Sequence, residues 1–223
     1  MPAKGVGVKA IVVAGGDAVA GDAALLADAD LVIAADSGAA WLNTLGRRPD
    51  VVIGDMDSIA PALLAGLVAE GVLIERHPND KDASDAELAV ALAIERGADE
   101  VVILGALGGR RLDHQLANLL LLVEPAWRGV RLRIVRGETT ARPLHGGDQL
   151  RLEAREGAIA TLLPLSGDAV GVRTTGLRFP LDGETLSVGR TRGLSNVVVQ
   201  IPASVSLERG TLLVIESGKE PAE

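Results

Sequence analysis

The chain contains no cysteine, and aromatic residues make up only 1% of its 223 residues. The absence of cysteine excludes disulfide bonds and thiolate metal sites. Because aromatic side chains are so few, the core must be built from valine, leucine, isoleucine and alanine, within a hydrophobic fraction of 48%. The length is sufficient for one large domain or two small ones, each with its own core.

Basic residues are also in the minority. Lysine and arginine number 22 against 30 aspartates and glutamates, which gives a net charge of −8. Nucleic acids and anionic membranes bind basic faces, so we expect neither as a partner. No apolar run approaches the roughly 20 residues that a membrane-spanning helix needs. The first residues also lack the apolar region and cleavage site of a secretory signal, and we therefore expect a cytoplasmic protein.

Up to about residue 135, short β-branched runs alternate with alanine- and leucine-rich stretches of helical length. This alternation predicts a parallel sheet covered on both faces by helices. The clearest helix is expected from Ser84 to about Arg96, because Ser84 and Glu87 form a capping box and Gly97 follows. The runs expected to form strands are 11–13, 31–33, 51–53, 72–74, 101–104 and 132–135.

After Arg136 the pattern changes to short apolar runs separated by Gly, Pro, Ser and Asp, which is typical of a small β-sandwich or barrel. The runs expected to form strands here are 149–152, 159–163, 185–188, 197–201 and 211–215. We therefore predict an N-terminal parallel-sheet α/β nucleotide-binding domain, residues 1–136, and a C-terminal all-β sandwich domain, residues 137–223. The boundary is expected between Gly137 and Gly147.

Two clusters of aspartates lie at the ends of expected strands, where open α/β sheets bind their ligands. Carboxylates this close together repel one another unless a cation or a proton neutralises them. Mg²⁺ takes oxygen ligands together with substrate phosphates, so the clusters predict a Mg²⁺–nucleotide enzyme. The alternative is an Asx-capped turn in one cluster and solvated loop charges in the other. The aspartates are Asp55, Asp57, Asp80, Asp82 and Asp85.

Polar residues follow two further strands. Asp36 and Ser37 come after the run 31–33, although either could simply cap a helix. A glycine-rich turn at 105–109 precedes two arginines, and such a turn can enclose phosphate with main-chain N–H groups and a guanidinium. A tight turn with surface arginines is the alternative. Asp113-His114 opens the next helix, and Asn118 follows one turn later on the same side.

Together these motifs resemble those of the thiamine pyrophosphokinase family in order and approximate spacing, over nearly the whole chain. Two departures are an extra arginine, Arg110, before Arg111, and the sequence Asp-Ser-Gly at 36–38 where Asp-Gly-Gly is common. The matching segments are 35–38, 49–50 with 54–59, 82–85, 108–114 with Asn118, 176–181 and 193–196.

The resemblance implies transfer of the pyrophosphoryl group of ATP to the hydroxyethyl group of thiamine, giving thiamine diphosphate and AMP. Mg²⁺ would be the cofactor, ATP the co-substrate, and the enzyme a homodimer whose thiamine cleft is shared with the partner's β-sandwich. Catalysis and Mg²⁺ binding would fall to Asp55, Asp57 and Asp85, of which Asp57 or Asp85 would take the alcohol's proton. Nucleotide-binding residues would be Asp36, Asp82, Arg111 in preference to Arg110, Asp113, His114 and Asn118, and thiamine-binding residues Phe179, Ser195 and Asn196.

Two other functions are compatible with these residues. One is a related diphosphokinase that acts on another alcohol, such as a hydroxymethyl pterin. The other is a non-catalytic regulator that binds nucleotide or thiamine. The C-terminal motifs with Phe179 and Ser195-Asn196 favour thiamine, and the complete set of aspartates argues against a regulator, because a sensor would not need them all.

Overall fold

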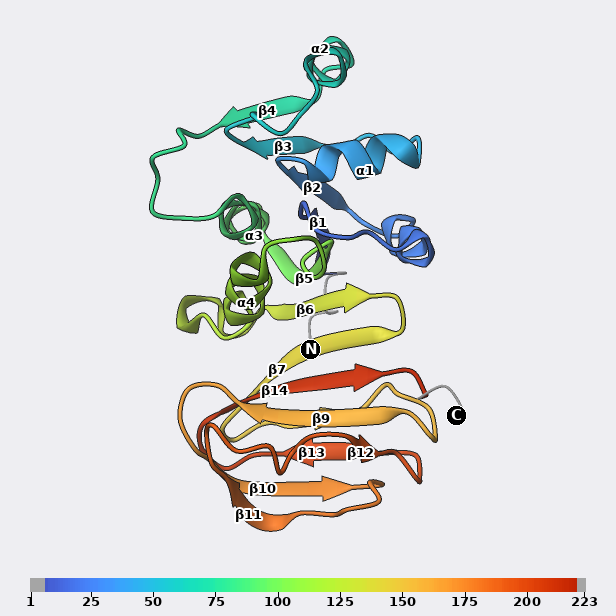
Figure 1. Ribbon diagram of the computed structural model, residues 1–223, viewed down its shortest axis with the longest axis vertical. Helices are drawn as coiled ribbons and strands as arrows, with labels where there is room; N and C mark the ends of the chain where they lie inside the picture. The colour runs from blue at the N-terminus through green and yellow to red at the C-terminus, as the bar shows by residue number, and fades with distance from the viewer. Residues whose placement is uncertain (1–6, 220–223) are drawn as a thin grey trace, which may run out of the picture. The chain divides into compact units, whose positions relative to one another are not determined.

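The computed structural model describes residues 7–219, and the chain divides between Gly137 and Glu138 into two compact units. The first unit contains a parallel sheet of strand order β6-β5-β1-β2-β3-β4 (Figure 1). Every strand expected in this part of the chain is confirmed. The bounds are β1 Val8–Val13, β2 Leu31–Ala35, β3 Val51–Gly54, β4 Leu73–Arg76, β5 Ala98–Leu104 and β6 Arg131–Arg136.

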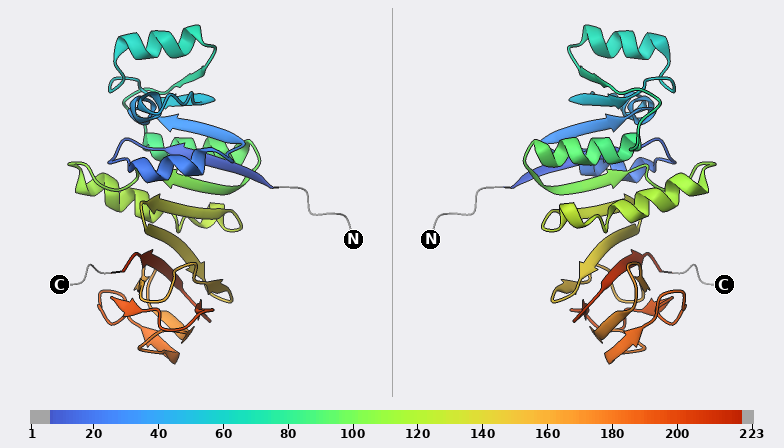
Figure 2. Two further views of the ribbon diagram at one scale, coloured as in Figure 1. Left: turned by 90° about the vertical axis from the view of Figure 1, so that its right-hand side faces the viewer. Right: turned by 90° about the vertical axis from the view of Figure 1, so that its left-hand side faces the viewer.

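Helices cover both faces of this sheet. Helices α3 and α4 lie on one face, and α1 and the 3₁₀ helix η1 lie on the other (Figures 1 and 2). This division follows from right-handed crossovers, because the chain first moves along the sheet from β1 to β4 and then returns to β5. The helices are η1 Ala20–Leu26, α1 Gly38–Thr44, α2 Pro61–Ala69, α3 Asp85–Glu95, α4 Leu112–Leu121 and η2 Pro125–Trp127. Within residues 7–219 no helix is long and apolar enough to span a membrane.

The capping box predicted for α3 is confirmed on its N-cap side. The Ser84 hydroxyl oxygen accepts a hydrogen bond from the backbone N–H of Glu87 at 3.1 Å. This bond satisfies one of the N–H groups that a helix start leaves unpaired. The helix buries only Val90 and alanines on its sheet-facing side, so its backbone can approach the strands closely. The first turn of α3 is thereby fixed at the carboxyl edge of the sheet.

The second unit is an antiparallel β-sandwich, as predicted. Its sheets have the strand orders β12-β9-β14-β7 and β11-β10-β13-β8. Leu162 and Leu212 from one sheet share a hydrophobic core with Val172 and Val205 from the other. The bounds are β7 Thr139–His145, β8 Gln149–Arg151, β9 Ile159–Pro164, β10 Ala169–Thr175, β11 Asp182–Leu186, β12 Asn196–Val197, β13 Ser204–Ser206 and β14 Thr211–Ser217.

Local details of the sandwich differ from the expectations. The segment 139–145, expected to lie in the boundary region, forms β7 and pairs with β14. The expected strand 197–201 shrinks to the end of β12, because Val199 and Gln200 both donate their backbone N–H to the carbonyl of Gly176 and leave the ladder. Strands β10 and β13 were not expected, since polar residues and glycine interrupt their apolar pattern.

Candidate active site

A cavity of about 570 Å³ lies at the carboxyl edge of the first sheet. Open α/β sheets bind their ligands at this edge, and the volume falls in the range of small-ligand sites. The walls come from the connections that follow β1, β2, β3, β4 and β5, together with the first turns of α3 and α4. The lining includes 14–16, 35–37, Ser58, Asn79, 81–86, Gly105, Ala106, 108–111, His114, Gln115 and Asn118.

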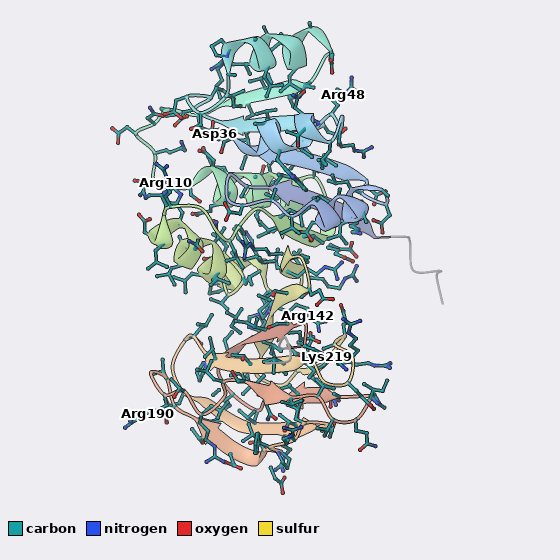
Figure 3. All side chains as sticks on the ribbon, turned by 45° about the vertical axis from the view of Figure 1, so that its right-hand side comes forward. Asp36, Arg48, Arg110, Arg142, Arg190 and Lys219 are labelled. Carbon is teal, nitrogen blue, oxygen red and sulfur yellow. The ribbon has the colours of Figure 1, made fainter. Side chains whose placement is uncertain are left out.

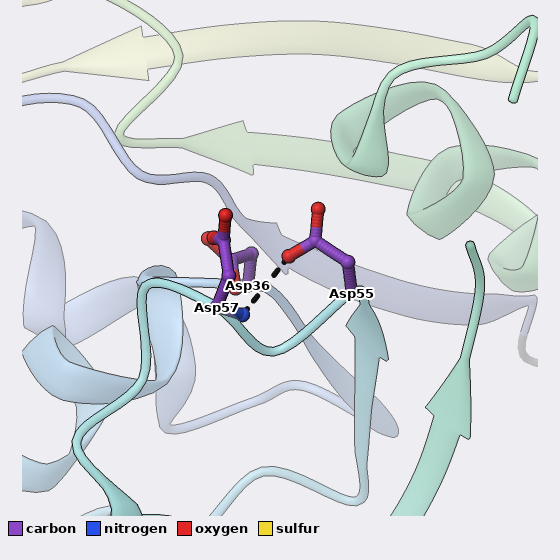
Figure 4. A group of neighbouring side chains, drawn as sticks. All are labelled: Asp36, Asp55 and Asp57. Carbon is purple, nitrogen blue, oxygen red and sulfur yellow. Dashed lines mark hydrogen bonds between the residues drawn. The ribbon is translucent and has the colours of Figure 1, made fainter. Parts of the chain in front are cut away.

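Three carboxylates converge beside this cavity: Asp36, Asp55 and Asp57 offer oxygen atoms that all lie within 4.8 Å of one another (Figure 4). The backbone after β3 is a turn and does not continue as a strand: Met56 has φ 69°, and the Asp57 N–H donates to Asp55 Oδ1 at 2.9 Å. Met56 is buried in the core and anchors the turn. The two flanking aspartates therefore converge through an Asx turn, which was the alternative reading of this motif.

Asp36 is the most constrained member of this group. Its φ of 45° is uncommon for a residue with a side chain. Burial raises the pKa of Asp36, and the charges of Asp55 and Asp85 add to the rise, against hydrogen bonds from Ser58 and Ser37 that lower it. Within residues 7–219, its buried Oδ1 has no hydrogen-bond partner. An all-oxygen group with an unpartnered buried oxygen fits a hard divalent cation such as Mg²⁺.

Asp85 lies next to this group. A Cβ added at Gly54 would lie 3.0 Å from Asp85 Cγ and 3.2 Å from Asp36 Cβ, so Asp85 and Asp36 flank the end of β3. Gly54 also has φ 141°, which disfavours any side chain there. The Nζ atom of Lys81 lies 3.1 Å from Asp85 Oδ1 and 3.9 Å from Asp55 Oδ2. The structure thus groups Asp36 with Asp55 and Asp57 and places Asp85 beside them, held by Lys81.

The loop after β1 also contributes to the site, although no motif predicted it. Gly16 donates its N–H to the carbonyl of Gly105 at 2.7 Å, and a Cβ on Gly16 would lie 2.5 Å from that oxygen. A Cβ on Gly15 would lie 2.1 Å from Ser37 Oγ. Gly15 thus leaves room for the hydroxyl of Ser37 in its present rotamer. The sequence feature that could have indicated this loop is the pair Gly15-Gly16, which follows the first expected strand, 11–13, after one residue.

Helix α4 holds the glycine-rich loop after β5. Gln115 Oε1 accepts a hydrogen bond from the Gly108 N–H at 2.9 Å, and Asn118 Nδ2 donates to the Ala106 carbonyl at 2.8 Å. Asn118 is only 8% exposed and lines the cavity with His114 and Gln115. Gln115 was not among the expected site residues, because a single glutamine one turn into a helix carries no motif.

Arg111 and Asp113 form a pair at the cavity mouth. Arg111 donates from Nε to Asp113 Oδ1 at 2.9 Å and from its terminal nitrogen to Oδ2 at 2.5 Å. The hydrogen bonding raises the pKa of Arg111 and holds the pKa of Asp113 well below its usual range. Arg110 and Arg111 both line the cavity, as does Asp82; Figure 3 labels Arg110 and Asp36. Asp113 does not line the cavity itself, but it holds the guanidinium of Arg111, which does.

The expected thiamine-binding residues lie in the second unit. Phe179 is 64% exposed, and its backbone is held by the buried side chain of Asn196. Asn196 Oδ1 accepts from the Phe179 N–H at 3.0 Å, and Nδ2 donates to the Phe179 carbonyl at 2.7 Å. Ser195 has φ 54° and donates its N–H to Thr161 Oγ1 at 3.1 Å. Asn196 therefore fixes the backbone position from which the exposed ring of Phe179 extends.

These features define a class before any comparison is made: a nucleotide-dependent transferase with a carboxylate-bearing α/β unit and a separate β-sandwich. Comparison with known proteins narrows the class. The family model "Thiamin pyrophosphokinase, catalytic domain" matches residues 23–134, which is half of the chain, and "Thiamin pyrophosphokinase, vitamin B1 binding domain" matches residues 149–212. The chain therefore belongs to the thiamin pyrophosphokinase family.

Individual relatives agree with this assignment. Thiamine pyrophosphokinase from Bacillus subtilis is 26% identical over 187 residues, which cover 84% of this chain and 87% of the relative. Thiamine pyrophosphokinase 1 from Oryza sativa is 30% identical over 160 residues, or 68% of this chain and 60% of the longer plant protein. A crystal structure of the Bacillus subtilis enzyme superposes with a TM-score of 0.85 at 25% identity, covering 95% of this chain and all of that structure.

Proposed function

We propose that this protein is an ATP:thiamine diphosphotransferase, which transfers the pyrophosphoryl group of ATP to the hydroxyl of thiamine and releases AMP. The observation that carries the proposal is the group of carboxylates Asp36, Asp55 and Asp57 beside the cavity at the sheet edge. Thiamine is proposed as the substrate because both parts of the chain match thiamin pyrophosphokinase domains. The bond that forms joins the thiamine oxygen to the β-phosphorus, and the bond that breaks joins that phosphorus to the AMP oxygen.

Asp55, Asp57 and Asp85 would hold Mg²⁺, with Asp36 completing the acidic group. The bound metal would neutralise charge on the triphosphate and on the group being transferred. The protein's own contribution is to fix these carboxylates before substrate arrives, through the buried Met56 and the first turn of α3. The thiamine hydroxyl loses a proton as it reacts, and Asp57 and Asp85 are the candidate acceptors.

The phosphates would lie along the loops after β1 and β5. Glycines there let phosphate oxygens approach the main chain, since Gly105, Gly108 and Gly109 all have positive φ. Arg111 would contribute charge-assisted hydrogen bonds from a guanidinium that Asp113 already orients. Asp82, His114 and Asn118 line the same cavity and would complete the nucleotide site.

Thiamine would bind against the exposed ring of Phe179, with Ser195 and Asn196 holding the surrounding loop. An aromatic ring exposed on a β-sandwich offers a stacking surface to the planar rings of thiamine. We propose a homodimer in which thiamine stacked on Phe179 of one protomer reacts at the carboxylate group of the other protomer. A cytoplasmic location is part of the same proposal, because ATP and Mg²⁺ are both supplied there.

The proposal predicts a specific pair of products. Purified protein incubated with ATP, Mg²⁺ and thiamine should release AMP and thiamine diphosphate in equal amounts, as separated by anion-exchange chromatography. Formation of ADP, or no turnover, would contradict it. Replacing thiamine by a hydroxymethyl pterin should abolish AMP release, and faster release with the pterin would assign the protein to a different diphosphokinase.

The substitution Phe179→Ala is expected to raise the KM for thiamine on the order of tenfold or more, the loss typical of one aromatic stacking contact. The KM for ATP should stay unchanged, because the cavity that we assign to ATP is lined by residues of the first unit. The ring is exposed, so circular dichroism and the melting temperature should match those of the wild type. An unchanged KM for thiamine would show that Phe179 does not bind thiamine.

Mixing variants tests whether the sites are shared between protomers. Asp57→Asn and Phe179→Ala chains, refolded together in equal amounts, should form heterodimers that carry one intact site. Random pairing would restore about a quarter of the wild-type sites. The assay uses thiamine well below the KM of the Phe179→Ala homodimer. Activity no higher than the mean of the two separate variants would show that each protomer works alone.

A further inference from the structure

Lys81 occupies an unusual position for a loop lysine. It lies in the connection between β4 and α3, and its side chain is only 15% exposed. Its Nζ is 3.1 Å from Asp85 Oδ1 and 3.9 Å from Asp55 Oδ2, and it donates to the Pro78 carbonyl at 3.1 Å. One ammonium group therefore contacts two carboxylates that the proposed function gives to Mg²⁺.

The surroundings of Lys81 carry a surplus of negative charge. Asp36 and Asp57 lie with Asp55 in the carboxylate group, and Asp85 adjoins it. Because carboxylates this close repel one another, a neighbouring cation stabilises their ionised forms. Among the lysines and arginines of residues 7–219, only Lys81 has an ion pair with this group of aspartates, to Asp55 and to Asp85.

We propose that Lys81 is an internal counter-cation that competes with the divalent metal for Asp55 and Asp85, and so sets the metal affinity of the site. This inference rests on the proposed function and deepens it. The ammonium and a divalent cation carry charge of the same sign and need the same oxygens, so each must weaken the binding of the other. Lys81 also lines the cavity, so an ammonium released by the metal is free to face the phosphates of the nucleotide. Lys81 is thus a positioning residue in the metal-free state.

An ordinary ion pair would behave differently. Lys81 and Asp85 are four residues apart, and exposed pairs at this spacing on a helix contribute little to stability. Lys81, however, precedes the helix, is largely buried, and reaches Asp55 on a different connection. Lys9 provides a matched comparison, since it is equally buried and pairs with Asp28 at 2.7 Å far from the carboxylate group in the sequence.

The decisive experiment titrates metal-free protein with Mn²⁺ alone and follows free Mn²⁺ by electron paramagnetic resonance. The substitution Lys81→Met should tighten Mn²⁺ binding on the order of tenfold, the size expected for removing one unit charge a few ångströms from a dication. Lys81→Arg keeps the charge and should bind Mn²⁺ within about twofold of the wild type. Lys9→Met should leave the affinity unchanged.

Thermal unfolding gives an independent readout. Metal-free Lys81→Met should melt below the wild type, because its carboxylates have lost their counter-cation. Mg²⁺ should then raise the melting temperature of Lys81→Met by more than it raises that of the wild type, since stabilisation by a ligand grows with its affinity. Lys9→Met lacks a different ion pair and should show the wild-type Mg²⁺ shift.

The outcomes separate this inference from the proposed function. Tighter Mn²⁺ binding by Lys81→Met supports the counter-cation even if thiamine proves not to be the substrate. Unchanged or weaker binding by Lys81→Met overturns it even if AMP release from ATP and thiamine is confirmed. Tightening by Lys9→Met to the same degree would also overturn it, because the effect would then follow from net charge and not from the contacts of Lys81.

Discussion

Asp57→Asn is expected to lower kcat/KM for pyrophosphoryl transfer by about a thousandfold or more, because it removes a charged oxygen from the proposed metal site. Asparagine has nearly the same shape as aspartate and can still accept the hydrogen bond that Ser58 donates at 2.8 Å. The fold should therefore remain intact. Asp55→Asn should behave similarly, since its Oδ1 accepts from the Asp57 N–H and an amide oxygen can do the same.

Stability of the metal-free variants distinguishes a lost charge from a damaged fold. The raised pKa of Asp36 means that its ionisation costs stability in the folded state, and this cost grows as the pH rises from its ordinary 3.8 through the folded-state pKa. Part of the rise comes from the charge of Asp55. At neutral pH the metal-free Asp55→Asn protein should therefore melt at or above the wild-type temperature, and Mg²⁺ should stabilise it less.

Asp80→Asn is the matched control. Asp80 belongs to the same acidic connection as Asp82 and Asp85, but its side chain is exposed and does not line the cavity. AMP release by Asp80→Asn should equal that of the wild type. Wild-type rates of AMP release in both Asp55→Asn and Asp57→Asn would show that these residues are not needed for catalysis. A large loss of rate in Asp80→Asn would show that overall charge, and not position, controls the rate.

The fold of the first unit was predictable because its signals are local. The central strands β2 and β3 are continuous apolar runs, and Ser84 with Glu87 marks the start of α3 within four residues. The edge of the sheet that binds ligands follows from strand direction alone. In the second unit the signals are weaker, since β10 contains Gly171 and polar residues, and β7 contains Pro143.

The geometry of the site depends on backbone conformations that no motif encodes. The positive φ of Met56 turns the chain between Asp55 and Asp57, and that of Asp36 brings a carboxylate from a neighbouring connection into the same group. Gln115 reaches the loop after β5 only because α4 packs beside it. Asn196 reads from the sequence as a ligand-binding residue, yet its amide holds the backbone of Phe179.

Gly38 connects the fold directly to the site. It begins α1 immediately after Asp36 and Ser37, and a Cβ added to it would lie 2.0 Å from the backbone oxygen of Val13 and 2.8 Å from its carbonyl carbon. Neither backbone can yield without moving β1 or α1. Any shift of α1 would displace Asp36 from Asp55 and Asp57, so this glycine protects both the packing and the carboxylate group.

Gly38→Ala is therefore expected to destabilise the first unit by about 3 kcal/mol, the upper part of the usual range for overpacking. Gly66→Ala is the matched control, because Gly66 lies inside α2 with open space around its Cα. Alanine at this position should raise the free energy of unfolding by about 0.5–1 kcal/mol. Urea unfolding followed by tryptophan fluorescence reports on this unit, because Trp41 and Trp127 both lie in it. Equal urea midpoints for Gly38→Ala and the wild type would show that α1 can shift without cost; in that case Asp36 does not depend on the contact between Gly38 and Val13.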